Sequence, residues 1–335
     1  MSDKMPDICA HLLCGHDVIN SLESQNWKRV LNERIKIFNL GCQGPDIFFY
    51  NDFWPWRKKK RGPEIGIMMH LKKTGDFFIE SFKYLKKRVN DYNDYLTLFT
   101  YLSGFICHFA LDRNAHPFIH YQSGVHDKNK PETFKYSIYH KKLELIIDTI
   151  LLKERKNLYT YKYPVHREVY LQKVPKILIN FYKYILKKLY KPKIEIDFIE
   201  DSFKDFAKAF KIIHDPYGFK KVLLNIIDLL TDKSIEYSSL IYPRYIDEKK
   251  DYLNRKHNLW NHPCAKEEIH YESFDDIYKK AIEESKQMIE GAIRYIDGQI
   301  KEEELKDFFP NISYSTGKHV DEDCKLIYYD PIFDR

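Results

Sequence analysis

The chain has 335 residues, of which 44% are hydrophobic and 16% aromatic, and its formal net charge is +6. This apolar content excludes a disordered chain, and a charge this modest does not by itself indicate nucleic-acid binding. The sequence contains no run of the ~18 apolar residues that a membrane span needs, and residues 1–7 show neither the basic nor the apolar region typical of a signal peptide. We therefore expect a cytoplasmic protein or one peripheral to a membrane.

Apolar residues recur at helical spacing along most of the chain, and no alternating strand pattern stands out. This pattern predicts one all-helical domain over residues 1–335, with a polar centre held by the N-terminal half. Six scattered cysteines without a C-x-x-C pair predict reduced thiols rather than a disulfide framework. The predicted helices cover residues 9–24, 27–38, 75–90, 92–114, 133–154, 168–190, 199–213, 218–231 and 273–297, and the predicted loops cover 41–66, 117–131, 155–166, 191–197 and 240–270.

Two imidazoles and two carboxylates stand out in the first part of the chain. His11 is an imidazole among apolar residues of the first predicted helix, and Asp7 precedes it by four residues, where it acts either as an N-cap or as a ligand. Asp46 ends the glycine- and proline-rich turn 41–46, where it either ligates a cation or closes an Asx turn. His70 is a further imidazole in apolar surroundings.

An aromatic segment that includes Trp54 and Trp56 runs into the basic cluster at 57–61. Aromatic rings favour the headgroup level of a bilayer, and basic residues are attracted to anionic lipid. The segment is therefore a candidate membrane rim of the site. The alternative is a loop whose aromatic residues pack on the core while its charges are solvated.

The stretch 104–117 carries the strongest pattern. His108 and Asp112 are four residues apart in an apolar helical run, so both side chains lie on one face of the helix. Pro117 disfavours helical geometry at the residue before it, so we expect His116 at or just past the helix end. Two imidazoles and a carboxylate converging in apolar surroundings indicate a metal site, although a structural His–Asp hydrogen bond is the alternative.

His140 and Glu144 form a second pair four residues apart, which is either a surface ion pair or part of the same site. Imidazoles together with carboxylates suit zinc. The candidate ligands in this chain number eight, which is more than one tetrahedral site holds. They fit two or three ions if one carboxylate bridges two of them. The full predicted set is His11, Asp46, His70, His108, Asp112, His116, His140 and Glu144.

The order and spacing of these pieces resemble the zinc-dependent phospholipase C family, whose superfamily includes fungal single-strand nucleases. The resemblance covers about the first 150 residues, and the Asn261-His262-Pro263 stretch is similar to a loop of some bacterial members. It implies an all-α bundle around a buried polynuclear zinc site, with a ligand-bearing core at about 1–155 and packing helices at about 165–335. It assigns the first zinc to Asp46, His70, His108 and Asp112, the second to His116, His140 and Glu144, and the third to His11 and the bridging Asp112.

The chain departs from the secreted phospholipases of this family in two ways. Their third zinc also uses the amino group and carbonyl of an N-terminal Trp, whereas ten residues without Trp precede His11 here. In addition, three residues separate Asp112 and His116, where the secreted enzymes have five.

The resemblance implies a zinc-dependent phosphodiester hydrolase that cleaves glycerophospholipids to diacylglycerol and a phosphorylated headgroup. Asp46 is the candidate catalytic base, and transient contact with a membrane surface is expected. One alternative is a single-strand nuclease or nucleotidase that uses the same metals. The other is a non-catalytic protein whose metal is structural, or which attaches to membranes through residues 54–61.

Overall fold

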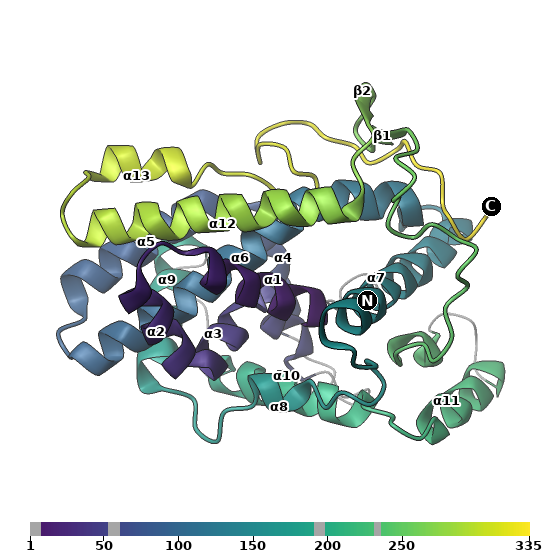
Figure 1. Cartoon of the computed structure of the whole chain (residues 1–335), viewed down its shortest axis with the longest axis horizontal. Coiled ribbons are helices and arrows are strands. Elements are labelled where there is room, and N and C mark those ends of the chain that lie inside the picture. The colour runs from purple at the N-terminus through teal and green to yellow at the C-terminus, as the bar shows by residue number, and fades with distance from the viewer. Residues whose placement is uncertain (1–7, 53–60, 191–197, 231–235) are drawn as a thin grey trace.

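The computed structural model describes residues 8–52, 61–190, 198–230 and 236–335 (Figure 1). It is built of α-helices with one two-stranded antiparallel sheet, which confirms the predicted all-α class. The elements are α1 (Ile8–Ser21), α2 (Gln25–Glu33), α3 (Ile35–Gly41), η1 (Gly44–Tyr50), α4 (Gly62–Leu71), α5 (Thr74–Arg88), α6 (Tyr92–Ser123), η2 (Pro131–Thr133), α7 (Phe134–Lys156), α8 (His166–Val169), α9 (Lys176–Leu189), α10 (Ile199–Ile213), α11 (Phe219–Leu230), η3 (Tyr237–Leu240), β1 (Trp260–His262), β2 (Ala265–His270), α12 (Phe274–Ile296) and α13 (Glu302–Phe308).

The long helix α6 forms the centre of the fold. Asp91 caps its N-terminus by accepting a hydrogen bond from the backbone N–H of Asp94 at 2.8 Å, and Gly124 ends it with φ +76°. Its middle is buried on all sides, because aliphatic and aromatic side chains such as Phe105 and Phe109 surround the helix. Helices α12, α3, α7 and α1 pack against it (Figure 1), so polar side chains on α6 face the interior of the protein.

Helix α6 continues past Pro117 to Ser123, so the prediction that His116 lies at or beyond the helix end was wrong. A proline inside a helix removes the hydrogen bond to the carbonyl four residues earlier, which here belongs to Arg113. The backbone at Gly317 covers this turn. A Cβ on Gly317 would lie 2.6 Å from the carbonyl oxygen of Arg113 and 3.2 Å from Cγ of Pro117. A distant segment therefore packs over the interrupted turn, and no local pattern could show this.

Other boundaries also differ from the prediction. The predicted loop 41–66 contains η1 and the start of α4, and the predicted loop 240–270 begins at the last residue of η3 and contains the hairpin β1–β2. The predicted helix 168–190 is divided into α8 and α9, because Pro175 precedes the first residue of α9. Asp7, Trp54 and Trp56 lie outside the described residues.

The prediction of reduced thiols was wrong for one pair of cysteines. Cys264 and Cys324 form a disulfide between the hairpin and the C-terminal segment, with their Cα atoms 5.2 Å apart. The two residues are 60 positions apart in the sequence, and their spacing gives no indication of pairing. The other four cysteines, Cys9, Cys14, Cys42 and Cys107, are free and buried.

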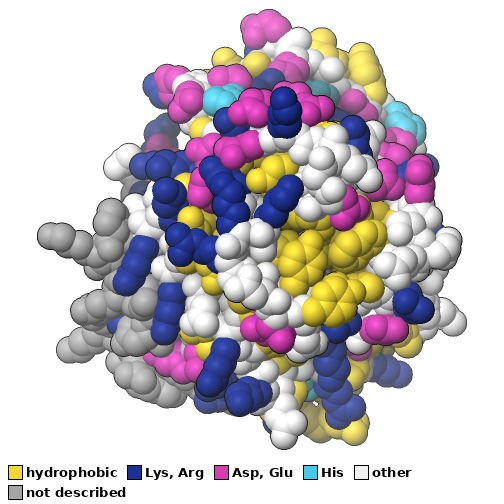
Figure 2. All heavy atoms as spheres, turned by 90° about the vertical axis from the view of Figure 1, so that its left-hand side faces the viewer, with side chains coloured by type: hydrophobic (Ala, Val, Ile, Leu, Met, Phe, Trp, Pro, Cys, Tyr) yellow, Lys and Arg dark blue, Asp and Glu magenta, His cyan; other side chains and the backbone are white. Residues whose placement is uncertain are grey.

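Among the described residues, no helix is long and apolar enough to cross a bilayer. On the face shown in Figure 2, Lys and Arg side chains are interspersed with Asp and Glu around a smaller apolar area. The division of the chain into a ligand-bearing core and packing helices within one domain stays a prediction.

Candidate metal centre

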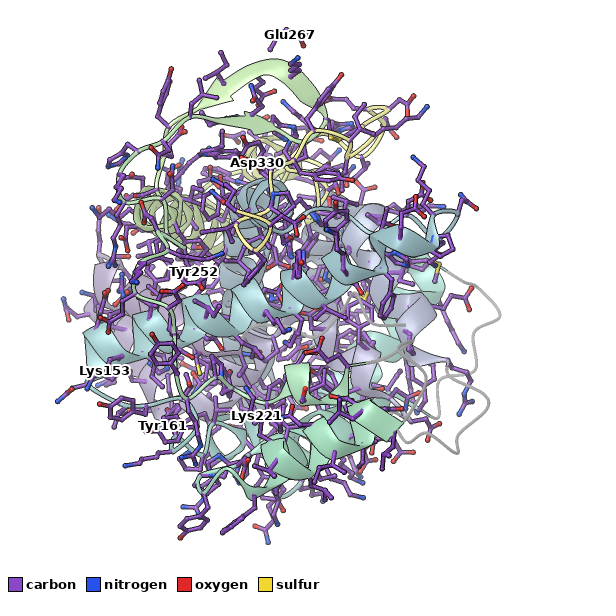
Figure 3. The ribbon with its side chains drawn as sticks, turned by 90° about the vertical axis from the view of Figure 1, so that its right-hand side faces the viewer. Lys153, Tyr161, Lys221, Tyr252, Glu267 and Asp330 are labelled. Atoms are coloured by element: carbon purple, nitrogen blue, oxygen red, sulfur yellow. A yellow bond between two sulfur atoms is a disulfide. The ribbon has the colours of Figure 1, made fainter. Side chains whose placement is uncertain are left out.

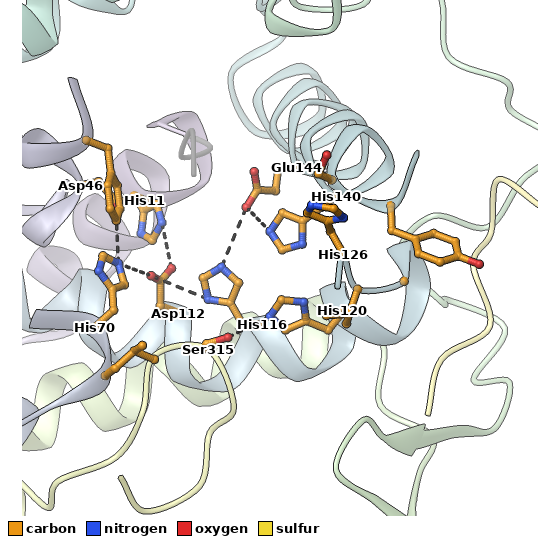
Figure 4. Close-up of a pocket in the computed structure, with 16 residues that line it drawn as sticks. His11, Asp46, His70, Asp112, His116, His120, His126, His140, Glu144 and Ser315 are labelled. Carbon is orange, nitrogen blue, oxygen red and sulfur yellow. Dashed lines mark hydrogen bonds and ion pairs between the residues drawn. The ribbon is translucent and has the colours of Figure 1, made fainter. Parts of the chain in front are cut away.

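A cavity of about 240 Å³ lies between α6 and α7, with η1, α4 and the C-terminal segment at its sides. Figure 4 shows that imidazoles and carboxylates from these elements point into it. The residues are far apart in sequence, and the packing of α1, η1, α4 and α7 around the buried helix α6 brings them together. Seven of the eight predicted ligands line this cavity, and the eighth, His108, lies directly behind it.

Four of the predicted ligands form a first group. Asp46, His70, His108 and Asp112 each offer one ligand atom, and these four atoms lie within 4.8 Å of one another. Nε2 of His70 is 3.1 Å from Oδ1 of Asp46, and Nε2 of His108 is 3.2 Å from Oδ2 of Asp112. The side chains are at most 11% exposed. Such a group of imidazoles and carboxylates shielded from water has the composition of a zinc site.

Backbone carbonyls fix the orientation of both imidazoles in this group. A carbonyl only accepts, so Nδ1–H of His70 donates to Gly66 at 2.7 Å and Nδ1–H of His108 donates to Cys42 at 3.2 Å. In the neutral rings, Nε2 then carries the lone pair and faces the carboxylates. Nε2 of His108 is buried and makes no hydrogen bond within the described structure. This is the arrangement in which metal-ligating histidines are normally held.

A second group contains His116, His140 and Glu144, whose ligand atoms also lie within 4.8 Å of one another. Nε2 of His140 is 3.0 Å from Oε1 of Glu144, and Nδ1–H of His116 donates to the carbonyl of Tyr314 at 3.0 Å. Because α6 continues past residue 116, the short spacing between Asp112 and His116 is one helical turn, which places His116 on the same face.

Asp112 lies between several imidazoles. Its Oδ1 is 3.2 Å from Nε2 of His11, while its Oδ2 is 3.2 Å from Nε2 of His108. The ring of His11 also stacks on that of His108, with centroids 4.3 Å apart. His11 belongs to neither group, but it faces Oδ1 of Asp112, whereas His108 at 3.2 Å and His70 at 3.9 Å face Oδ2. This is the arrangement that a bridging carboxylate requires.

The ionisation of the buried groups suits metal binding. Burial alone would raise the pKa of Asp112, but His108, His116 and His11 lower it well below its ordinary value. Burial likewise opposes the ionisation of Asp46, yet His108 and His70 lower its pKa. Burial lowers the pKa of His108 and so favours the neutral ring. Ionised carboxylates beside neutral imidazoles are the protonation states that ligands need.

Asp148 on α7 holds the start of α1 and thereby the position of His11. Its carboxylate accepts hydrogen bonds from the backbone N–H of Cys9 at 2.9 Å and of Ala10 at 2.6 Å, and from the hydroxyl of Tyr242 at 2.6 Å. These N–H groups belong to the first turn of α1, where they lack helical partners. Helix α7 therefore supplies both Glu144 and, one turn later, the group that anchors α1.

We expect Asp148→Asn to destabilise the protein by roughly 2–4 kcal/mol, because a buried carboxylate that accepts charge-assisted hydrogen bonds is replaced by a neutral amide. Urea unfolding measures this change. Asp228→Asn is the matched control, since Asp228 also accepts two backbone N–H bonds, at 2.8 and 2.9 Å, but does not line the cavity. We expect phosphodiester turnover to fall only in Asp148→Asn. Equal turnover in the two variants would contradict the positioning role.

The prediction missed residues of the C-terminal segment, which it treated as part of a packing region. The hydroxyl of Ser315 is 3.0 Å from Nε2 of His120, and the ring of Tyr314 packs 4.9 Å from that of His70. His262 from the hairpin donates to the carbonyl of Thr316 at 2.9 Å and so holds this segment in place. His120 follows His116 by four residues, a spacing that would have indicated it if the helix had been extended past Pro117.

The fold is helical, and two adjacent groups of largely buried imidazoles and carboxylates could each hold a metal ion, which is the arrangement of a metal-dependent hydrolase. A sequence model of zinc-dependent phospholipase C matches residues 10–217, which is more than half of the chain. The chain belongs to the zinc-dependent phospholipase C family, as predicted from the motifs. No curated protein and no solved structure matches it significantly.

Proposed function

We propose that the protein hydrolyses glycerophospholipids on the glycerol side of the phosphate, releasing diacylglycerol and a phosphorylated headgroup. The observation that carries this proposal is that two groups of possible metal ligands lie close to Asp112 in one cavity. The chain that holds them belongs to the zinc-dependent phospholipase C family. We propose two or three zinc ions. The first would be held by Asp46, His70, His108 and Asp112, the second by His116, His140 and Glu144, and a third by His11 and Asp112.

The residues fit zinc by the chemistry of their donor atoms. The Nδ1–H groups of His70, His108 and His116 donate to backbone carbonyls, and buried Nε2 of His108 makes no hydrogen bond in the described structure. Bound zinc supplies two things here: a lowered pKa for coordinated water, toward ~7, and stabilisation of negative charge on phosphoryl oxygens.

In the proposed reaction, the oxygen of a water molecule attacks phosphorus and the bond from phosphorus to the glycerol oxygen breaks. Asp46 accepts a proton from the attacking water, which its ionised state allows. The glycerol oxygen takes a proton from solvent water and leaves as the hydroxyl of diacylglycerol, and Asp46 returns its proton to solvent. Phe49, stacked 5.3 Å from His70, and Leu71 give one wall of the cavity an apolar surface suited to the glycerol side of a lipid.

The test uses three substrates with the same zinc-loaded protein: phosphatidylcholine vesicles, a soluble chromogenic phosphodiester and single-stranded DNA. We expect diacylglycerol release and chromogenic turnover that a chelator abolishes and added zinc restores. Preferential cleavage of DNA would instead assign the site to a nuclease. A folded, zinc-loaded protein that cleaves none of the three would overturn the proposal.

A further inference from the structure

Helix α11 has its apolar face on the outside of the protein. The side chains of Leu229 and Leu230 are 85% and 81% exposed, and none of the helix is buried. The predicted helix at 218–231 is thus confirmed over Phe219–Leu230, but its apolar side does not pack on the core. We name this surface the α11 outer face, and it consists of Phe219, Val222, Leu223, Ile226, Leu229 and Leu230.

Polar contacts on the inner side fix the helix in this orientation. Asp215 caps its start by accepting from the N–H groups of Gly218 and Lys221, each at 2.9 Å. Near its end, Asp228 accepts from the N–H groups of Tyr237 and Ser238. Both carboxylates are therefore turned inward and engaged with backbone. The apolar stripe is left as the exposed surface of a helix that these contacts hold in place.

The start of the helix is flanked by exposed basic and aromatic side chains. Lys211, Lys220 and Arg244 are exposed there, and the guanidinium of Arg244 lies against Gly218. Tyr217 and Tyr245 are 80% and 81% exposed. Basic residues are attracted to anionic lipid, and tyrosine rings favour the headgroup level. This combination of a wide apolar stripe, basic flanks and aromatic residues is typical of a helix that lies in a membrane interface.

We propose that the α11 outer face inserts into the interface of an anionic phospholipid bilayer and docks the protein there. Binding of this face to a bilayer does not depend on the proposed function. Only its role, which is to bring the cavity to a lipid substrate, rests on that function. Figure 3 shows α11, marked by the label of Lys221, at the edge of the molecule. Helix α11 contacts η3, and η3 contacts α7, the helix that carries His140 and Glu144. The helix α11 is thus joined through η3 to the helix that forms one wall of the cavity.

Vesicle flotation tests the proposal, with phosphatidylcholine vesicles that contain or lack phosphatidylglycerol. The variant L223D/L230D places charge on the outer face at two exposed positions, so the fold is expected to survive, which circular dichroism checks. The matched control is Tyr92→Asp, which places charge on an apolar side chain that is 74% exposed at the first residue of α6. Turnover of the soluble chromogenic phosphodiester is measured for all three proteins.

We expect wild-type protein and Tyr92→Asp to float with anionic vesicles, and L223D/L230D to bind them at least about tenfold more weakly. Turnover of the soluble chromogenic phosphodiester should be equal in the wild type, Tyr92→Asp and L223D/L230D. Flotation of L223D/L230D at the wild-type level, or no flotation of the wild type, would overturn the proposal. So would a wild-type dimer that L223D/L230D converts to monomer without a change in flotation. Normal flotation without any phosphodiester turnover would instead contradict the proposed function and leave the docking surface in place.

Discussion

Replacing Asp112 by asparagine is expected to remove bound zinc and lower phosphodiester turnover by more than about a hundredfold. Substitution of groups that merely orient ligands already costs metal sites about 10–100-fold. Asp112 does more, because its two oxygens face His11 and His108 at 3.2 Å each. An asparagine of the same shape has no charge and only one acceptor oxygen. It therefore cannot bind one ion on the side of His11 and another on the side of His108. We expect the loss of more than one ion from a single isosteric change.

Elemental analysis of the purified variant, alongside turnover of the chromogenic phosphodiester, measures this effect. Circular dichroism shows whether the helices are retained. Asp334→Asn is a matched control for the loss of one carboxylate, because Asp334 pairs with Lys135 at 2.9 Å on the surface, outside the cavity. An Asp112→Asn protein with wild-type zinc content would show that this residue does not bridge the two sides of the centre.

The parts of this site that the sequence predicted correctly are those that depend on a single helix. His108 and Asp112 share a face of α6, and His140 and Glu144 share a face of α7, because residues four apart on a helix are neighbours. The approach of Asp46 and His70 to the first pair required the fold, and the sequence indicated it only through the resemblance to a family. The structure brings both residues into the first group.

What the sequence could not predict depends on contacts between distant segments. The turn of α6 at Pro117 is covered by Gly317, and the carbonyl of Tyr314 orients His116, yet nothing near residues 314–317 marks them as neighbours of α6. The disulfide between Cys264 and Cys324 holds the same C-terminal segment to the hairpin. Helix α11 is a related case, because an apolar periodicity predicts a helix correctly but does not say whether its apolar face meets the core or the outside.

Gly44→Ala is expected to disrupt both the fold and the metal centre. Gly44 has φ +50°, a conformation that costs an L-residue roughly 1–2 kcal/mol. A Cβ at this position would lie 2.1 Å from Cδ2 and 2.7 Å from Nε2 of the His108 ring. Overpacking of a core costs typically about 1–3 kcal/mol. Together these terms give an expected loss of about 2–5 kcal/mol in the free energy of unfolding.

Gly298→Ala separates the two contributions, because Gly298 has φ +76° and no atom within 4 Å of an added Cβ. This control should lose only the conformational part, and it should keep zinc and full turnover. In Gly44→Ala, the ring of His108 must move, and a shift of about 1 Å in a reacting group can cost about a hundredfold in rate. Urea unfolding and zinc content measure both variants. Equal stability losses, with zinc retained in both, would show that the turn at Gly44 does not fix His108. The position of this ring would then depend on α6, the carbonyl of Cys42 and the stacked ring of His11.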